Sequence, residues 1–225
     1  PAGLAGSSDV ATFDNSCTNW NVTVDANVNV LGMNMQSTYT GIITQSSAFT
    51  MTVGTSQWNQ AGGTFAGGSG NISISDNFIL SGGTFTSTSG VLQIGRMNSG
   101  STTAFNYSAG TFNHNSGKVR FIGGNYDATV IQTVDVPSTV TFYDLEEAIT
   151  DTFTPANDNL VPGSGDTIII AHDFTLTDGV LSGDWQVQGN VIIGSAADGE
   201  GVAGGSSGTI TMIGTGSKTY TCLLY

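Results

Sequence analysis

Charged side chains are scarce in this chain of 225 residues, and positive ones are the scarcest. Asp and Glu together number 17 but Lys and Arg only 4, so the net charge is −13 at pH 7. Contacts to phosphate dominate affinity for nucleic acids, so this acidity argues against nucleic acid as a partner. The shortage of cations also argues against a basic helix on a membrane surface. No apolar run approaches the roughly 18 residues of a membrane span.

The sequence also lacks clear helix signals. Only 4 residues are proline, and no segment has the 3.6-residue period of a convincing amphipathic helix. Residues 143–149 contain helix formers, but strand alternation over residues 139–142 leads directly into them, so a strand is favoured and a short helical turn is the alternative. Aromatic and β-branched residues recur throughout, which argues against disorder. Their alternation with polar residues predicts short, half-buried strands.

What the chain does contain is a 17-residue unit in three copies, at residues 58–74, 78–94 and 105–121. Each copy begins with an aromatic residue, continues to a Gly-Thr-Phe motif, and ends in a short alternating strand that follows a glycine. The spacing inside the unit is constant, whereas the copies are offset by 20 and 27 residues. Self-similarity at such periods indicates stacked units, none of which can bury its apolar face alone.

Weaker repetition extends further along the chain. Residues 174–193 follow the unit with a longer spacer, and residues 207–212 repeat the strand pattern of residues 116–121. We therefore divide the chain into repeats at 51–225 and a strand-rich N-terminal section at 1–50, which lacks the motif and is interpreted as a cap or joining segment. The chain is expected to continue beyond Tyr225, because it stops within an apparent strand.

These features predict an all-β fold, a parallel β-solenoid that forms a single elongated domain of roughly nine or ten coils, with rungs about 4.8 Å apart. The glycine of Gly-Thr-Phe would form a corner with positive φ, which a residue with a Cβ adopts only at a cost. Aromatic residues would stack in the interior. A β-sandwich with chance glycine-rich turns is the alternative. The predicted interior residues are Trp58, Phe65, Phe78, Phe85, Phe105, Phe112, Phe174 and Leu181.

Carboxylates are the main candidates for chemistry. They gather at two places in the sequence, one after the Tyr143 position and one in a glycine-rich loop. Calcium binds six to eight oxygen ligands, so acidic loops are weak Ca²⁺ candidates, although neither group matches a defined calcium motif. Solvated loop acids are the alternative. The residues are Asp144, Glu146, Glu147 and Asp151 in the first group, and Asp198 and Glu200 in the second.

No catalytic motif is recognisable. His114 and His172 lie in distant segments, which gives no zinc-site spacing, and both are interpreted as ordinary surface or corner residues. Arg120 alternates with apolar neighbours and is expected to face solvent. The sequence therefore predicts no enzyme, no catalytic residue and no bound cofactor other than the weak calcium candidates.

The cysteines are Cys17 and Cys222, near opposite ends of the chain. A disulfide needs Cα atoms within about 7 Å, so an intrachain bridge contradicts a linear solenoid. Two interpretations remain. The thiols are isolated or buried, or they pair between subunits, or with a continuation of the chain, in an oxidising exterior.

The Ser-Gly-Gly-Thr-Phe repeats and the Ser-Gly-x-Val/Ile-x-Ile/Phe strands resemble those of large secreted bacterial β-solenoid proteins, including adhesin-like and autotransporter-passenger-like surface proteins. Residues 141–145 and 214–221 also resemble segments of that group. The resemblance implies export, a repetitive scaffold, and a place on the cell surface or in an extracellular assembly. The chain departs from enzymes with β-helix folds, such as pectate lyases, because it has no visible cluster of Asp with Arg or Lys.

We therefore expect a non-enzymatic, extracellular structural protein, a β-solenoid subunit or fragment of a cell-surface fibre, sheath or adhesin. A homo-oligomer or head-to-tail polymer is the expected assembly, with surface glycans as further partners. One alternative is a carbohydrate-binding or carbohydrate-cleaving β-helix protein, in which Trp20, Trp58 or Trp185 would stack on sugars. The repeat places Trp58 in the interior instead. The other alternative is a phage-type tail spike.

Overall fold

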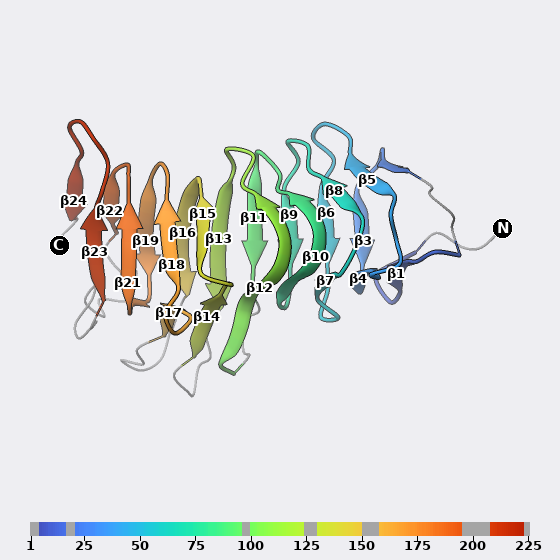
Figure 1. The fold of residues 1–225 in the computed structure, drawn as a ribbon, viewed down its shortest axis with the longest axis horizontal. Helices are drawn as coiled ribbons and strands as arrows, with labels where there is room; N and C mark the ends of the chain where they lie inside the picture. Colours follow the sequence, from blue (N-terminus) through green and yellow to red (C-terminus); the bar gives the residue numbers. More distant parts are fainter. Residues whose placement is uncertain are drawn as a thin grey trace. The chain divides into compact units, whose positions relative to one another are not determined.

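The computed structural model describes residues 5–16, 21–95, 100–123, 130–149, 158–194 and 208–222. These residues form strands joined by turns, and none of them is helical (Figure 1). Every strand pairing given below is parallel, which confirms the predicted all-β solenoid. The chain divides into two compact units, one of residues 1–94 and 105–117 and the other of residues 95–104 and 118–225.

The first unit winds around three sides, and each side is a ladder of parallel strands. The first ladder contains β1 (Val10–Phe13), β4 (Gly32–Met35), β7 (Trp58–Gln60), β10 (Phe78–Thr86) and the part of β12 (Thr102–Asn113) that belongs to this unit. The second contains β2 (Val22–Val24), β5 (Ile42–Gln45), β8 (Thr64–Ala66) and the end of β10. The third contains β3 (Val28–Val30), β6 (Met51–Val53), β9 (Ile72–Ile74) and β11 (Val91–Ile94).

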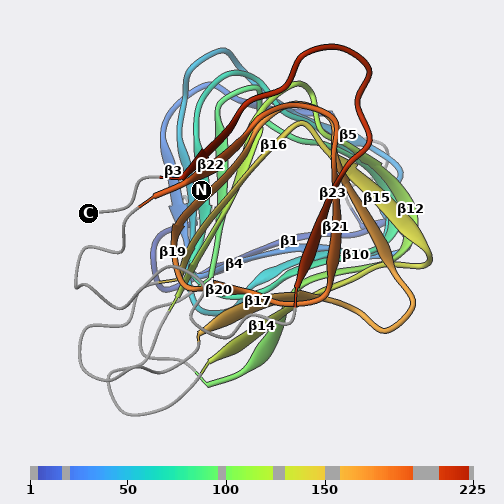
Figure 2. The same cartoon turned by 90° about the vertical axis from the view of Figure 1, so that its left-hand side faces the viewer.

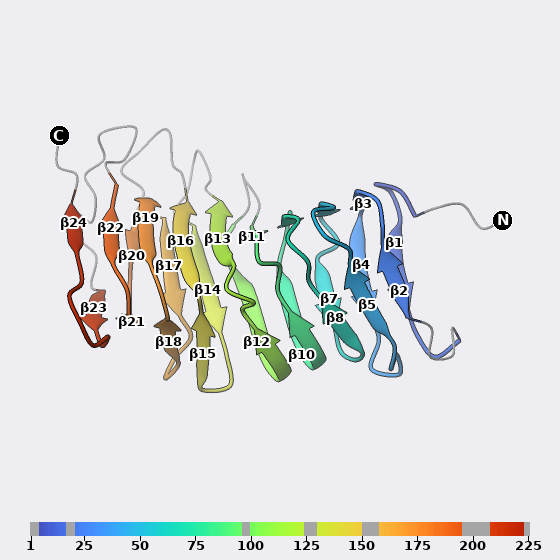
Figure 3. The same ribbon diagram turned by 90° about the horizontal axis from the view of Figure 1, so that it is seen from above.

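The second unit is also three-sided, and Figure 2 shows its β19, β20 and β21 on different sides. One ladder contains β13 (Lys118–Gly123), β16 (Asp144–Ile149), β19 (Phe174–Asp178), β22 (Val191–Ile193) and β24 (Tyr220–Cys222), which lie side by side in Figure 3. Another contains β14 (Ile131–Asp135), β17 (Asn159–Pro162) and β20 (Val180–Leu181). The last contains β15 (Thr139–Phe142), β18 (Thr167–Ile170), β21 (Asp184–Val187) and β23 (Thr209–Met212).

Two sequence expectations about these strands have clear outcomes. The segment at residues 143–149 is a strand, β16, and not a helical turn. The number of coils was slightly overestimated, since the solenoid has about seven turns in place of nine or ten. The repeat length was applied to the whole chain, whereas β1–β3 and β23–β24 belong to turns that cannot be followed without interruption through the described residues.

The N-terminal section lacks the Gly-Thr-Phe motif but carries the same ladders. Met33 of β4 is in register with Trp58 of β7, and Ile43 of β5 is in register with Phe65 of β8. Both Met33 and Ile43 are buried. Smaller apolar residues therefore continue the interior columns there, so the strands extend without the sequence signature.

The aromatic residues of the repeat form two interior columns in the first unit. Phe78 is in register with Phe105, and their ring centroids lie 4.9 Å apart with nearly parallel planes. In the other column Phe85 stacks on Phe65 at 5.2 Å. The columns meet edge to face, with Phe78 and Phe85 centroids 4.7 Å apart, a preferred aromatic geometry. Constant spacing inside the repeat therefore brings each ring onto its equivalent in the next turn.

Burial of the predicted interior residues follows these columns. Seven of the eight are buried, and the eighth, Phe112, is half-buried. Phe112 still stacks on Phe85, with centroids 5.9 Å apart. The buried ones are Trp58, Phe65, Phe78, Phe85, Phe105, Phe174 and Leu181.

The glycine of the motif has the positive φ that the sequence predicts. Gly63, Gly83 and Gly110 have φ values of 64°, 73° and 94°. A Cβ on Gly83 would lie 2.2 Å from the carbonyl oxygen of Gly63 in the preceding turn. Both the backbone conformation and the close approach of successive turns therefore require glycine at this corner.

The aromatic columns give a direct test of core packing. We expect Phe85→Ala to destabilise the first unit by about 3–5 kcal/mol, because it opens a cavity between stacked rings. The same substitution at Phe49, whose side chain is 36% exposed, should cost less than about 1 kcal/mol. Denaturant-induced unfolding followed by circular dichroism measures both, and equal losses would contradict the assignment of Phe85 to the core.

Candidate functional site

Strand alternation separates the acidic residues that the sequence groups together. Asp144, Glu146 and Glu147 all lie on β16, but Asp144 and Glu146 are partly exposed on its outer face whereas Glu147 is buried. Asp151, Asp198 and Glu200 lie outside the described residues. The sequence-level calcium candidates therefore do not act as one group on β16.

Glu146 is paired with cations on the neighbouring rung. Its carboxylate lies 2.9 Å from Lys118 Nζ and 3.3 Å from Arg120 Nε, both on β13. Thr177 of β19 donates a hydrogen bond of 3.2 Å to the same carboxylate. Arg120 thus lies on the partly exposed outer face, as its alternation predicts. A metal ion at Glu146 would have to compete with two positive side chains, so Glu146 is a poor metal ligand.

Glu147 lies in the interior and interrupts an apolar column. It is in register with Phe121 on one side and Leu176 on the other, and it is fully buried. The backbone N–H of Leu160 donates a 3.1 Å hydrogen bond to Oε1. Oε2 is buried without a hydrogen-bond partner. Sequence reasoning placed this residue in a solvated acidic group, and its burial corrects that interpretation.

The environment of Glu147 favours its neutral form. Burial raises the pKa of the Glu147 carboxyl well above its ordinary value, and the nearby Asp178 carboxylate raises it further. The hydrogen bond from Leu160 opposes these effects but is the smaller influence compared with burial. An ionised carboxylate without full pairing is costly in an apolar interior, so a bound proton is the physical solution here.

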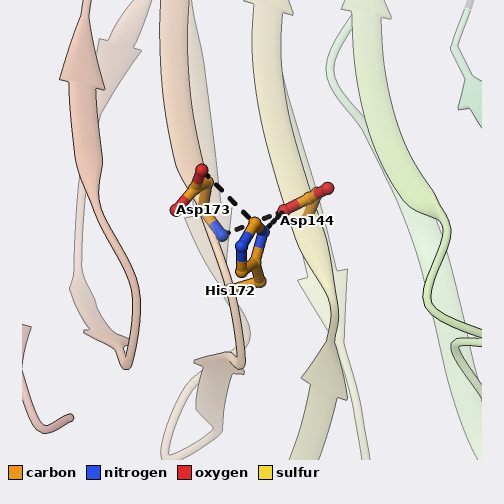
Figure 4. A group of neighbouring side chains, drawn as sticks. All are labelled: Asp144, His172 and Asp173. Carbon is orange, nitrogen blue, oxygen red and sulfur yellow. Dashed lines mark hydrogen bonds and ion pairs between the residues drawn. The ribbon is translucent and has the colours of Figure 1, made fainter. Parts of the chain in front are cut away.

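A second group on the outer face brings together residues that are far apart in the sequence. His172 Nδ1 lies 2.7 Å from Asp144 Oδ1 and 3.8 Å from Asp173 Oδ2. One ligand atom from each of the three side chains lies within 4.8 Å of the others. Figure 4 shows Asp144 on one rung and His172 with Asp173 on the next. We call these three residues the Asp–His–Asp cluster.

Two features of the chain hold His172 in place. The offset from β15 to β18 is 28 residues, as from Phe142 to Ile170, but the offset from β16 to β19 is 29, as from Leu145 to Phe174. The corner before β19 therefore has one additional residue. The imidazole stacks on the ring of Tyr143 in the preceding corner, with centroids 4.9 Å apart and planes 11° from parallel.

The aspartates of the cluster also belong to a backbone-capping ladder. Asp144 Oδ1 accepts a 2.9 Å hydrogen bond from the N–H of Asp173, which is its equivalent on the next rung. Asp173 Oδ1 in turn accepts bonds from the N–H and the Nδ2 of Asn190, each 2.9 Å long. Asn190 Oδ1 accepts from the N–H of Thr219. Each of these side chains therefore stabilises the start of the next strand.

The first unit uses the same device with asparagine alone. Asn27 Oδ1 accepts a 3.0 Å bond from the N–H of Thr50, and Asn71 Oδ1 accepts one from Val91. A neutral amide therefore suffices at this ladder position. The negative charges of Asp144 and Asp173 are not required by the ladder, and these two are the ladder residues that lie beside His172.

Sequence reasoning missed this cluster because it depends on register. His172 was interpreted as an ordinary strand-end residue, and Asp173 was not considered. An alignment of residues 142–145 with residues 170–174 would have placed Asp144 opposite Asp173, but only if one inserted residue had been allowed. His114 has a different setting, since its Nδ1 accepts a bond from the N–H of Ser116 within a turn.

Several other sequence candidates can be placed, and some cannot. Trp58 and Trp185 are fully buried, so neither presents a ring to an external sugar. Trp20 and Cys17 lie outside the described residues, and Cys222 is described only as a residue of β24. The pairing of the cysteines therefore stays a prediction.

Comparisons with protein-family models, with curated proteins and with solved structures found no match for this chain. Among the described residues, no helix has the length and apolar character needed to cross a membrane. The β-solenoid fold and the local geometry are therefore the basis for any functional proposal.

The buried carboxyl of Glu147 predicts how stability varies with pH. Its folded pKa lies above the unfolded value near 4.3, so its contribution is complete below the unfolded pKa and is lost as pH rises through the folded pKa. Between the two values the unfolding free energy should fall by about 1.4 kcal/mol per pH unit. Glu147→Gln, which keeps the shape but cannot ionise, should remove this slope.

The measurement is denaturant-induced unfolding of the natural chain and the variant across pH 4 to 9 (roughly the range in which a raised carboxyl pKa would act). Asp184→Asn is the matched control, because it makes the same chemical change at an exposed position of the second unit. If Glu147→Gln and Asp184→Asn have the same pH dependence, Glu147 is not the titrating group.

Proposed function

We propose that this protein is a non-enzymatic structural component of the cell exterior, a β-solenoid subunit or fragment of a surface fibre, sheath or adhesin of the kind found in secreted bacterial β-solenoid proteins. The supporting observation is the in-register stacking of equivalent residues within each unit, from the aromatic columns inside to the capping ladder at the corners. Such an arrangement satisfies successive strands with one another and makes a long, stable scaffold from short strands.

The outer faces suit a structural role in an aqueous exterior. In the first unit Thr52, Ser73 and Gln93 occupy successive rungs of one column, and Gln93 Nε2 donates a 3.3 Å hydrogen bond to Ser73 Oγ. Neutral hydroxyl and amide groups can stack at rung spacing without charge repulsion. They also offer donors and acceptors to neutral glycans, which supports surface glycans as partners of an adhesin.

Carbohydrate cleavage is the alternative, and one feature of the second unit favours it. Asp166 and Asp184 both line a surface hollow of about 390 Å³. Glycosidases act through two carboxyl groups, typically about 5–9.5 Å apart across the scissile bond. However, Asp166 Oδ2 already accepts a 2.9 Å bond from the N–H of Val136, which assigns that carboxylate a structural task. The buried Trp58 and Trp185 also weaken this alternative.

Assembly and location follow from the same proposal. The edge of a parallel ladder can pair with a further strand, so association with other copies of the chain is the expected mode of assembly. A secreted location accords with the low content of cations and with an outer surface of neutral polar residues. Both statements are proposals that experiments on the native material can test.

The test of function is localisation in the source cells. Antibodies raised against the purified chain should label the surface of intact cells or an extracellular assembly, because a structural component must be exported. Permeabilised cells and pre-immune serum are the controls. Label that appears only after permeabilisation would contradict the proposal, as would turnover of a polysaccharide that Asp166→Asn or Asp184→Asn abolishes.

A further inference from the structure

We propose that the Asp–His–Asp cluster is a zinc site that joins two successive rungs of the second unit. Its ligands would be His172 Nδ1 and the carboxylates of Asp144 and Asp173. Asp144 belongs to β16, whereas His172 and Asp173 precede β19 (Figure 4). The proposal goes beyond the structural function and does not depend on it.

The distances within the cluster suit a tetrahedral ion. Bonds of roughly 2.0–2.2 Å to zinc place two ligands of a tetrahedron roughly 3.3–3.5 Å apart. The observed separations from His172 Nδ1 are 2.7 Å to Asp144 Oδ1 and 3.8 Å to Asp173 Oδ2, which lie on either side of that value. Small side-chain rotations would therefore bring all three groups to bonding distance, with water as the remaining ligand.

The donor set favours zinc over calcium or magnesium. Calcium and magnesium prefer oxygen ligands alone, whereas a neutral imidazole is a good ligand for zinc. The side chains of His172, Asp144 and Asp173 are 50%, 26% and 28% exposed, so an ion can reach them from solvent. The weak calcium interpretation of Asp144 is thus replaced by one that includes a histidine.

The surrounding contacts orient the ligands. The ring of Tyr143 fixes the plane of the imidazole by stacking on it. The N–H of Asp173 holds Asp144 Oδ1, and Asn190 holds Asp173 Oδ1, which leaves Asp173 Oδ2 directed toward His172. Hydrogen bonds of this kind commonly position metal ligands in proteins.

Charge supplies an independent argument. Asn27, Asn71 and Asn190 show that the capping ladder works with a neutral amide. The two aspartates on the ladder are nevertheless placed on adjacent rungs, where their charges repel. Lys118 is in register with Asp144, but its ammonium pairs with Glu146 at 2.9 Å. A divalent cation between the aspartates would balance the charge that remains.

The experiment is calorimetric titration of the full chain with Zn²⁺, in a Cys17→Ser, Cys222→Ser background because thiolates also bind zinc. We expect one site per chain. His172→Ala, Asp144→Asn and Asp173→Asn should each weaken binding by about 10-fold or more. The two asparagine variants retain the side-chain acceptor of the ladder and should therefore remain folded, which circular dichroism will verify.

His114→Ala and Asp184→Asn are the matched controls, since they remove the other histidine and an exposed carboxylate of the second unit. Both should bind Zn²⁺ as the parent does. Zinc should also raise the thermal midpoint of the parent and leave that of His172→Ala unchanged. Absence of zinc binding, equal binding by His172→Ala, or Ca²⁺ binding as tight as Zn²⁺ binding would each overturn the proposal.

Discussion

The parallel, in-register pairing of successive turns is the constraint on which the rest of this structure depends. It places each residue directly beside its equivalent one rung away, at about 4.8 Å. Whatever a position contains is therefore repeated along a column, and its interaction with itself decides whether it is tolerated. Phe78 beside Phe105 gains a stacked contact in this way, and Asn190 beside Asp173 gains a capping hydrogen bond.

The same constraint explains why the chain has so few charged residues. Equal charges one rung apart repel, whereas neutral threonine, serine and asparagine can bond along a column. Where charges do occur in the second unit, each has a specific compensation. Glu146 is paired with Lys118 and Arg120, Asp144 lies against His172, and the buried Glu147 has a pKa raised by its burial. Such local exceptions are where chemistry beyond the scaffold is to be sought.

Much of the interior was predictable from the sequence, and the outer cluster was not. Constant spacing inside the repeat identified Trp58 and Phe85 as core residues, because like residues at a fixed interval must stack if the turns are equivalent. The number of turns was less predictable, since the segments between units vary in length. Glu147 was misplaced because a local group of acids does not reveal which side of a strand each one occupies.

The sequence by itself determined the class of fold, the glycine corners and the aromatic columns, all of which follow from periodicity and local backbone preference. Only the tertiary structure decided that His172 meets Asp144 and that Glu147 lies in the interior. The physical reason is that a single inserted residue at the corner before β19 sets the position of His172 against the preceding rung, and strand alternation sets the direction of Glu147. Both depend on register, which is fixed by the packing of whole turns and not by any one segment.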